Sequence, residues 1–313
     1  MEIIRRAKDF KRSFKNPVLT IGNFDGVHLG HQRIFQRVKE KAGEIGGESI
    51  VYTFEPHPAE ILAPELKPLL ITPLEEKLRL IEDQGMDITI CANFSEEFAC
   101  QTPEDFVKKI LYDQIKIRQL FVGHDYTFGK DRTGNIALLK EFGRKLGFNV
   151  EVVEAVRVGG MVVSSTLIRE LIQKGELREA ARLLGRPYLL TGRVIHGHAR
   201  GSKKLGFPTA NLKPTGALFP KPGIYAVFAI YAGKRYAGVA NLGWNPTFHD
   251  QKFSIEVHIL NFDQDIYGQR LQVEFVERLR DEVIFCGPEE LIAQIKKDIA
   301  QVKKILQAAE HKA

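Results

Sequence analysis

The chain has 313 residues, of which 44% are hydrophobic and 27% charged, proportions that exclude a mainly disordered protein and suit one large or two ordinary domains. No apolar run reaches the roughly 18 to 20 residues of a membrane helix, and the N-terminus lacks the apolar core of a signal peptide, so we expect a cytoplasmic protein with no membrane partner. The formal charge of +6 suits nucleic acid and anionic small molecules equally, but basic and aromatic residues are not interleaved, and we expect no nucleic-acid partner.

Short apolar or β-branched runs predict strands in the first half of the chain, with helical patterns between them. The strands are expected at 17–21, 49–54, 87–91, 118–122 and 149–155. Apolar residues at three- and four-residue spacing predict helices around 34–45 and 74–81. This alternation indicates a Rossmann-like α/β fold, in which a parallel sheet is covered on both faces and binds its ligand beyond the C-terminal ends of the strands.

The segment after the first predicted strand has the pattern of a phosphate cradle. It reads G-N-F-D-G-V-H-L-G-H, from Gly22 to His31, and leads into a helix. Its glycines permit tight turns and close approach of a ligand, and a helix N-terminus offers unpaired N–H groups to phosphate. The chain contains neither G-x-x-x-x-G-K-[ST] nor G-x-G-x-x-G, which excludes a Walker A loop and a dinucleotide fingerprint.

Two histidines of this segment, His28 and His31, are three residues apart, so on a first helical turn their rings would face the same way. Two imidazoles can donate hydrogen bonds to a triphosphate; the alternative is that they are unrelated polar loop residues. The H-x-G-H pattern resembles the signature of the nucleotidylyltransferase superfamily. In that chemistry an incoming phosphate attacks the α-phosphate of ATP and pyrophosphate leaves, so catalysis rests on positioning and charge neutralisation.

A second polar segment, at 163–169, opens another predicted helix. The hydroxyls of Ser164, Ser165 and Thr166 can cap this helix and bind phosphate through its exposed amides. Arg169 follows one turn later, placed for a transferring phosphate. An ordinary helix cap is the alternative, but the nucleotidylyltransferases that the first motif resembles also have this second element.

Over nearly its full length, the chain resembles the family of bacterial bifunctional riboflavin kinases/FAD synthetases. In the first half the resemblance rests on segments 22–31, 54–58, 72–77, 123–129 and 164–169. It implies an FMN adenylyltransferase in which His28, His31 and Arg169 are catalytic and in which ATP is bound by Gly22, Asn23, Phe24, Asp25, Gly30, Ser164, Ser165 and Thr166. It implies a flavin site bordered by Phe54, Pro56, His57, Pro58, Asp125 and Phe128. From the residues alone, the two phenylalanines suit a core equally well, and the Pro-His-Pro turn suits a structural role.

The pattern changes near residue 183. Helical periodicity ends at 182–187, where Gly185 and Pro187 form a stop and linker signal, so we expect domains at 1–183 and 184–313. Strands at 189–195, 224–231, 235–242, 253–260 and 271–276, separated by short turns, predict a small antiparallel β-barrel. A terminal helix is expected at 288–307, with one apolar face formed by Leu291, Ile292, Ile295 and Ile299.

The barrel half carries a second candidate nucleotide site in L-G-F-P-T-A-N. Glycines and the basic residues Arg200, Lys203 and Lys204 can meet the phosphates of a nucleotide. Thr209 and Asn211 supply the hard oxygen atoms that Mg²⁺ prefers. A Pro-Thr-x-Asn turn is common and proves little by itself. In combination with a partner motif, Gly206, Thr209 and Asn211 become candidate ATP-binding residues. Thr209 and Asn211 then become candidate metal ligands as well.

That partner is a strand in which Ile255, Val257 and Ile259 share one face, while Glu256 and His258 share the other. A solvent-facing glutamate is the ordinary explanation. Together with segments 206–211 and 241–248, however, the strand resembles the riboflavin kinase pattern, which implies that Glu256 is the general base for the ribityl hydroxyl. Arg280 and Phe285 resemble the flavin-flap positions of that family; a surface ion pair is the alternative for Arg280.

These motifs together predict one chain with two active sites. The C-terminal half would make FMN from riboflavin and ATP, and the N-terminal half would make FAD and pyrophosphate from FMN and a second ATP, each with Mg²⁺. Other H-x-G-H transferases act on other phosphates, but the kinase-like half favours flavins. An alternative of another class is a flavin-binding sensor or regulator that has lost one or both activities, which would bind flavin without consuming ATP. The sequence leaves the oligomeric state open.

Overall fold

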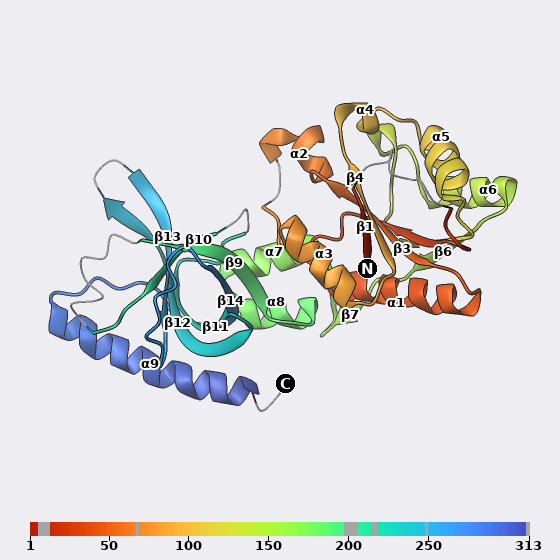
Figure 1. The fold of residues 1–313 in the computed structure, drawn as a ribbon. Helices are drawn as coiled ribbons and strands as arrows, with labels where there is room; N and C mark the ends of the chain where they lie inside the picture. The colour runs from red at the N-terminus through yellow and green to blue at the C-terminus, as the bar shows by residue number, and fades with distance from the viewer. Residues whose placement is uncertain (6–12, 67–68, 197–205, 215–217, 248–249, 311–313) are drawn as a thin grey trace. The chain divides into compact units, whose positions relative to one another are not determined.

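The structure, a computed structural model, describes residues 1–5, 13–66, 69–196, 206–214, 218–247 and 250–310 (Figure 1). The chain forms two compact units, Met1–Ser165 and Thr166–Ala313. Helices α7 (Ser165–Lys174) and α8 (Leu177–Leu184) lie almost wholly in the second unit, and α8 packs on its strands β9 (Tyr188–Ile195) and β14 (Arg270–Arg280). The boundary between compact units thus precedes these helices, whereas the helix-stop signal at Gly185, which caps α8, follows them.

The first unit is built on a six-stranded sheet of order β1-β4-β3-β2-β5-β6, and every neighbouring pair is parallel. The predicted parallel sheet is confirmed. Strand β1 was not predicted, because three residues are too few to show a pattern. The strands are β1 (Glu2–Ile4), β2 (Val18–Ile21), β3 (Ser49–Glu55), β4 (Ile88–Asn93), β5 (Gln119–Gly123) and β6 (Asn149–Val153).

Successive residues of β2, β3 and β5 enter two different hydrophobic cores, one on each face of the sheet. Val18 and Phe121 belong to the core that contains residues of α1 (Leu29–Glu44) and α3 (Leu74–Asp83). Leu19 and Ile50 belong to the opposite core, with residues of the π-helix η3 (Phe106–Ile115) and of α6 (Ile136–Leu146). Because side chains alternate along a strand, this division confirms that both faces of the sheet are covered.

Short elements connect these strands and helices. They are α2 (Pro58–Leu62), η2 (Pro64–Leu66), α4 (Glu96–Ala99), α5 (Pro103–Asp105), η4 (Lys130–Arg132), β7 (Arg157–Val158) and β8 (Met161–Val162). The segments that follow β2, β3 and β5 leave the sheet at its C-terminal edge, where a ligand was expected.

The second unit is a closed antiparallel barrel of order β10-β13-β12-β11-β14-β9, which confirms the predicted architecture (Figure 1). The prediction of a turn over Pro-Thr-x-Asn is wrong for its last two residues. Strand β10 begins at Ala210, because the backbone of β10 pairs with both β9 and β13. The strands are β9 (Tyr188–Ile195), β10 (Ala210–Pro214), β11 (Gly223–Tyr231), β12 (Lys234–Thr247), β13 (Asp250–Ile259) and β14 (Arg270–Arg280).

The terminal helix α9 (Pro288–Glu310) lies along the outside of the barrel, as Figure 1 shows. Its Val302 and Leu306 pack on Ala226 and Phe228 of β11, while its N-terminal half borders a cavity described below. The predicted helix is confirmed and extends three residues further than expected. None of the helices in the described parts of the chain combines the length and the apolar composition that a membrane-spanning segment needs.

Candidate active sites

The histidine pair lies at the N-terminus of α1. His28 is the N-cap residue, and its Nδ1 accepts a hydrogen bond from the backbone N–H of His31 at 3.3 Å. The two rings are stacked, with centroids 3.5 Å apart and an interplanar angle of 18°, and the Phe24 ring lies nearly perpendicular to that of His31 with centroids 5.1 Å apart. Because Nδ1 of His28 accepts this hydrogen bond, the proton of a neutral imidazole ring would lie on Nε2.

The loop that carries this pair is supported from within the protein. The carboxylate of Asp25 is 3% exposed and accepts hydrogen bonds from the backbone N–H groups of Ile71 and Thr72, each at 3.0 Å. In return, the hydroxyl of Thr72 accepts from the N–H of Gly26, a glycine with a φ of +85°. The side chains of Phe24 and Asp25, predicted to bind ATP, are thus buried, so a nucleotide would meet their backbone atoms.

One residue of the second phosphate-binding candidate, the segment 163–169, contacts the loop that carries the histidine pair. The hydroxyl of Ser165, at the start of α7, donates to the backbone carbonyl of Asp25 at 2.9 Å. Ser165 is the last residue of the first unit, and Thr166 and Arg169 follow in the second. The hydrogen bond places Ser165 beside the cradle, while the roles of Ser164, Thr166 and Arg169 stay predictions.

A cavity of about 890 Å³ opens beyond the C-terminal ends of the strands. Gly22 and Asn23, at the start of the histidine loop, form part of its lining. Of the residues predicted to border flavin, Phe54, His57, Pro58, Asp125 and Phe128 line it, whereas Pro56 is not among the lining residues. The structure therefore brings the predicted flavin residues and the first residues of the phosphate cradle to one cavity.

The cavity has an aromatic wall that no sequence motif predicted. Phe94 and Phe98 each lie within 6 Å of the Phe54 ring centroid, and Tyr126 is stacked on Phe128 with centroids 5.8 Å apart. These rings come from segments far apart in the chain, so no local pattern could have assembled them. The alternative that Phe54 and Phe128 are core residues also applies, because both pack with the hydrophobic core as well as lining the cavity.

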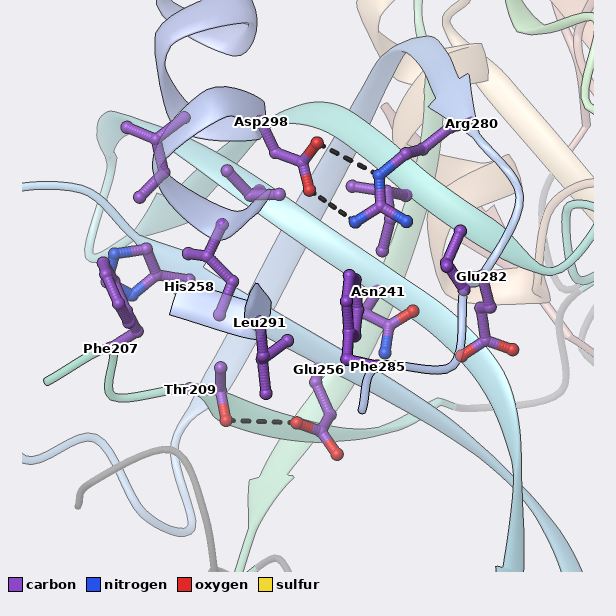
Figure 2. A pocket seen from close by; sticks show the side chains of 15 residues that line it. Phe207, Thr209, Asn241, Glu256, His258, Arg280, Glu282, Phe285, Leu291 and Asp298 are labelled. Carbon is purple, nitrogen blue, oxygen red and sulfur yellow. Dashed lines mark hydrogen bonds and ion pairs between the residues drawn. The ribbon is translucent and has the colours of Figure 1, made fainter. Parts of the chain in front are cut away.

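In the barrel, Glu256 is held by a residue of the second motif. The hydroxyl of Thr209 donates to Oε2 of Glu256 at 3.3 Å (Figure 2). Asn211 is the register partner of Glu256 across β10 and β13. The predicted alternation is confirmed, because Ile255 and Val257 are buried in the barrel while Glu256 faces a cavity outside it.

Asn241 was not predicted as a site residue, although it is the register partner of Glu256 on the other side, across β12 and β13. It lines the same cavity as Glu256, as Figure 2 shows. Its Oδ1 is buried and accepts no hydrogen bond from the described residues. A buried acceptor without a donor costs free energy, so a donor group on a ligand would stabilise this position.

This cavity, of about 360 Å³, is walled by the barrel and by α9. Both predicted flap residues line it. Phe285 presents its ring, and Arg280 donates to the two carboxylate oxygens of Asp298 at 3.0 and 2.6 Å. Arg280 thus forms an ion pair, but not the ordinary surface pair of the alternative, because Asp298 is buried in α9 and the pair forms part of the cavity wall. Apolar side chains of α9 complete it: Leu291, Ile295 and Ile299.

A neighbouring cavity of about 230 Å³ meets the first at Thr209, which lines both. Asn211, Phe262 and Tyr267 are among the residues around it. The segment before Thr209 is held by His258, whose Nδ1 lies 2.8 Å from the carbonyl oxygen of Pro208. Gly206 has a φ of +82° and precedes this segment, while Arg200, Lys203 and Lys204 lie outside the described residues.

Two family models match the chain in succession. Residues 10–167 match the FAD synthetase model, and residues 184–306 match the riboflavin kinase model. Among curated proteins, the chain is 37% identical to the bifunctional riboflavin kinase/FMN adenylyltransferase of Haemophilus influenzae, over 97% of this chain and 98% of that protein. It is 37% identical to the protein of the same name from Pseudomonas fluorescens, over the full length of both.

Among solved structures, the chain is similar to one described as a macrolide-efflux protein from Streptococcus pneumoniae. The two share a TM-score of 0.87 and 30% sequence identity, and the match covers 97% of this chain and 99% of that one. Both halves of the fold therefore occur together in another protein.

Proposed function

The chain belongs to the bifunctional riboflavin kinase/FMN adenylyltransferase family, and from this premise we propose how its residues divide the two reactions. The C-terminal half phosphorylates riboflavin to FMN with ATP, and the N-terminal half adenylylates FMN with a second ATP to FAD and pyrophosphate. We keep 1–183 and 184–313 as the proposed functional domains. One observation carries the assignment: each half has a cavity lined by its own predicted flavin residues.

In the kinase half, riboflavin would occupy the cavity of about 360 Å³, with its ring among Phe285 and the apolar residues of α9. The ribityl hydroxyl then lies at Glu256, which takes its proton as the hydroxyl oxygen attacks the γ-phosphorus of ATP. The bond from that phosphorus to the β-phosphate oxygen breaks, and ADP leaves. The hydrogen bond from Thr209 supports this role because it orients the Glu256 carboxylate.

ATP would occupy the adjoining cavity of about 230 Å³, so that its phosphates reach Thr209, which lines both cavities. The oxygen atoms of Thr209 and Asn211, opposite Glu256, fit a hard cation that takes its remaining ligands from phosphates and water. Bound there, Mg²⁺ would neutralise charge on the transferring phosphate. Gly206 remains a candidate for ATP binding through its backbone.

In the adenylyltransferase half, FMN would occupy the cavity of about 890 Å³, with its ring system beside Phe54 and Phe128. A phosphate oxygen of FMN attacks the α-phosphorus of ATP, the bond from that phosphorus to the β-phosphate oxygen breaks, and pyrophosphate leaves. His28 and His31 donate hydrogen bonds to the phosphates from the N-terminus of α1, and Arg169 neutralises charge. Mg²⁺ is expected here too, with no protein ligand assigned. We propose that both reactions occur in the cytoplasm without nucleic acid or membrane.

The first experiment supplies purified protein with riboflavin, ATP and Mg²⁺, in parallel with a reaction that starts from FMN, and separates the flavins by chromatography. FMN followed by FAD is expected. Accumulation of FMN alone would contradict the substrate proposed for the N-terminal half, and conversion of FMN alone would contradict the kinase assignment. Flavin binding with no turnover of ATP would instead support the sensor.

A further inference from the structure

Lys77, in α3, is a buried lysine with three hydrogen-bond acceptors around its ammonium group. Its residue is 6% exposed. The Nζ atom lies 3.3 Å from the backbone carbonyl oxygen of Asn23, 3.3 Å from Oγ1 of Thr53 and 3.4 Å from the backbone carbonyl oxygen of Phe54. An ammonium group has three donors and no acceptor, so these three partners match its full capacity.

The partners of Lys77 belong to two different walls of one cavity. Asn23 lies in the loop that leads to the histidine pair, and Phe54 is the half-buried, second-to-last residue of β3, just before the Pro-His-Pro segment; both line the cavity of about 890 Å³. Thr53 reinforces the link, because its hydroxyl also donates to the carbonyl of Asn23 at 3.3 Å. The ammonium group therefore joins the nucleotide side of the cavity to its flavin side.

A charge in this position is costly for folding. Burial lowers the pKa of Lys77, while the nearby Cys91, Glu55 and Asp25 act in the opposite direction. Apolar residues can replace buried ionic groups of similar volume without loss of stability in many proteins. A buried lysine therefore needs a reason other than packing, and here its hydrogen bonds to the histidine loop and to the end of β3 supply one.

We propose that Lys77 is a positioning residue for adenylyl transfer, which holds Asn23 and Phe54 in fixed relation so that the phosphate of FMN meets the α-phosphate of ATP. Lys77 acts through these backbone carbonyls and does not contact the reacting atoms. The inference rests on the proposed FMN adenylyltransferase function. Adenylyl transfer without a protein nucleophile depends on alignment of two substrates, and small displacements are costly in such reactions.

The test replaces Lys77 by methionine, which keeps an unbranched side chain and removes the donors. We expect kcat for FMN to FAD to fall by about 10- to 100-fold, with much smaller changes in KM for FMN and ATP. Riboflavin phosphorylation by the same molecules should not change, because that site lies in the other unit. Thr20→Val is the matched control: it removes a buried hydroxyl from β2 of the same sheet and should leave both reactions unchanged.

Two further variants keep the proposal testable if Lys77→Met folds poorly. Thr53→Val removes one acceptor of the ammonium group without burying an unpaired charge, and we expect a smaller fall in the same kcat. Lys77→Arg, which retains a cation and several donors, should recover part of the activity lost in Lys77→Met.

A purely structural role predicts a different outcome. Thermal unfolding of Lys77→Met would then shift, while kcat per folded molecule would stay within about twofold of the parent protein, and this result would overturn the proposal. Failure of the underlying function is recognised separately, because in that case the unsubstituted protein would itself form no FAD from FMN.

Discussion

Arg280 and Asp298 form a two-bonded ion pair that ties the last strand of the barrel to the C-terminal helix. Nε and Nη2 of Arg280 donate to Oδ1 and Oδ2 of Asp298 at 3.0 and 2.6 Å, and the amide of Gln294 also donates to Oδ1 at 2.8 Å. Planar, two-bonded pairs of this kind define geometry as well as charge. The pair stands at the wall of the proposed riboflavin cavity, so the position of α9 and the shape of that cavity are coupled.

Asp298→Ala should therefore weaken riboflavin binding and the fold together. The change leaves the partly buried guanidinium of Arg280 without its carboxylate, and we expect a loss of about 1 to 3 kcal/mol in the free energy of unfolding. The KM for riboflavin should rise more than kcat falls. Urea unfolding and steady-state kinase kinetics measure both effects.

The exposed pair of Glu179 and Arg182 in α8 provides the control for this change, since it lies in the same unit. Glu179→Ala should cost no more than about 0.5 kcal/mol. Equal losses from the two substitutions would show that the pair at the cavity has no special part in holding α9.

Glu256→Gln should separate the two reactions. Glutamine preserves the shape of the side chain but accepts the proton of the ribityl hydroxyl poorly, so kcat for FMN formation should fall by about 10²- to 10⁴-fold. Conversion of FMN to FAD should be unchanged, and His31→Ala should give the reverse pattern. Chromatography of flavins from both starting materials measures this, and loss of both activities in either folded variant would contradict two separate sites.

Asn241→Leu should weaken riboflavin binding without weakening the fold. The buried Oδ1 of Asn241 accepts no hydrogen bond from the part of the chain that the structure describes, so its removal relieves a desolvated acceptor and the free energy of unfolding should stay equal or rise. If the ribityl chain supplies the missing donor, the affinity for riboflavin should fall about tenfold. Quenching of flavin fluorescence measures the affinity, and unchanged binding would exclude Asn241 from the riboflavin site.

The adenylyltransferase should lose activity at alkaline pH because of Lys77. Burial lowers the pKa of this ammonium group below that of a free lysine, so it loses its proton earlier as pH rises. The facing groups are Asp25, Glu55 and Cys91; burial raises the pKa of Glu55 and of the Cys91 thiol.

The effect on stability has the opposite sign. Between the lowered pKa of Lys77 and that of a free lysine, the unfolded chain binds more protons than the folded one, so the contribution of Lys77 to stability rises with pH while activity falls. A pH profile of kcat measures the loss. Lys77→Arg stays protonated, so kcat of that variant should no longer fall at alkaline pH. An unchanged pH profile in the variant would assign the titration to another group.

Local patterns predicted much of this protein. Alternating and helical periodicities report which side chains are buried within one element, and they located most strands of the six-stranded sheet and of the barrel, the helix stop at Gly185 and the terminal helix. The spacing of the histidine pair also predicted that the two rings lie together, because a helical turn leaves residues three apart little freedom of relative position. Strands β1 and β10 were missed, since each is too short or too polar for a periodic signal and forms only by pairing with its neighbours.

The sequence by itself determined the family, the two reactions and the residues that carry their motifs, because those features lie within short continuous segments. Only the tertiary structure decided what surrounds them. It turned Asp25 inward to the amides of Ile71 and Thr72, paired Arg280 with Asp298, and placed Lys77 between the histidine loop and the end of β3. These contacts join segments distant in the chain, and their geometry follows from the register of strands and the packing of helices, which no local pattern contains.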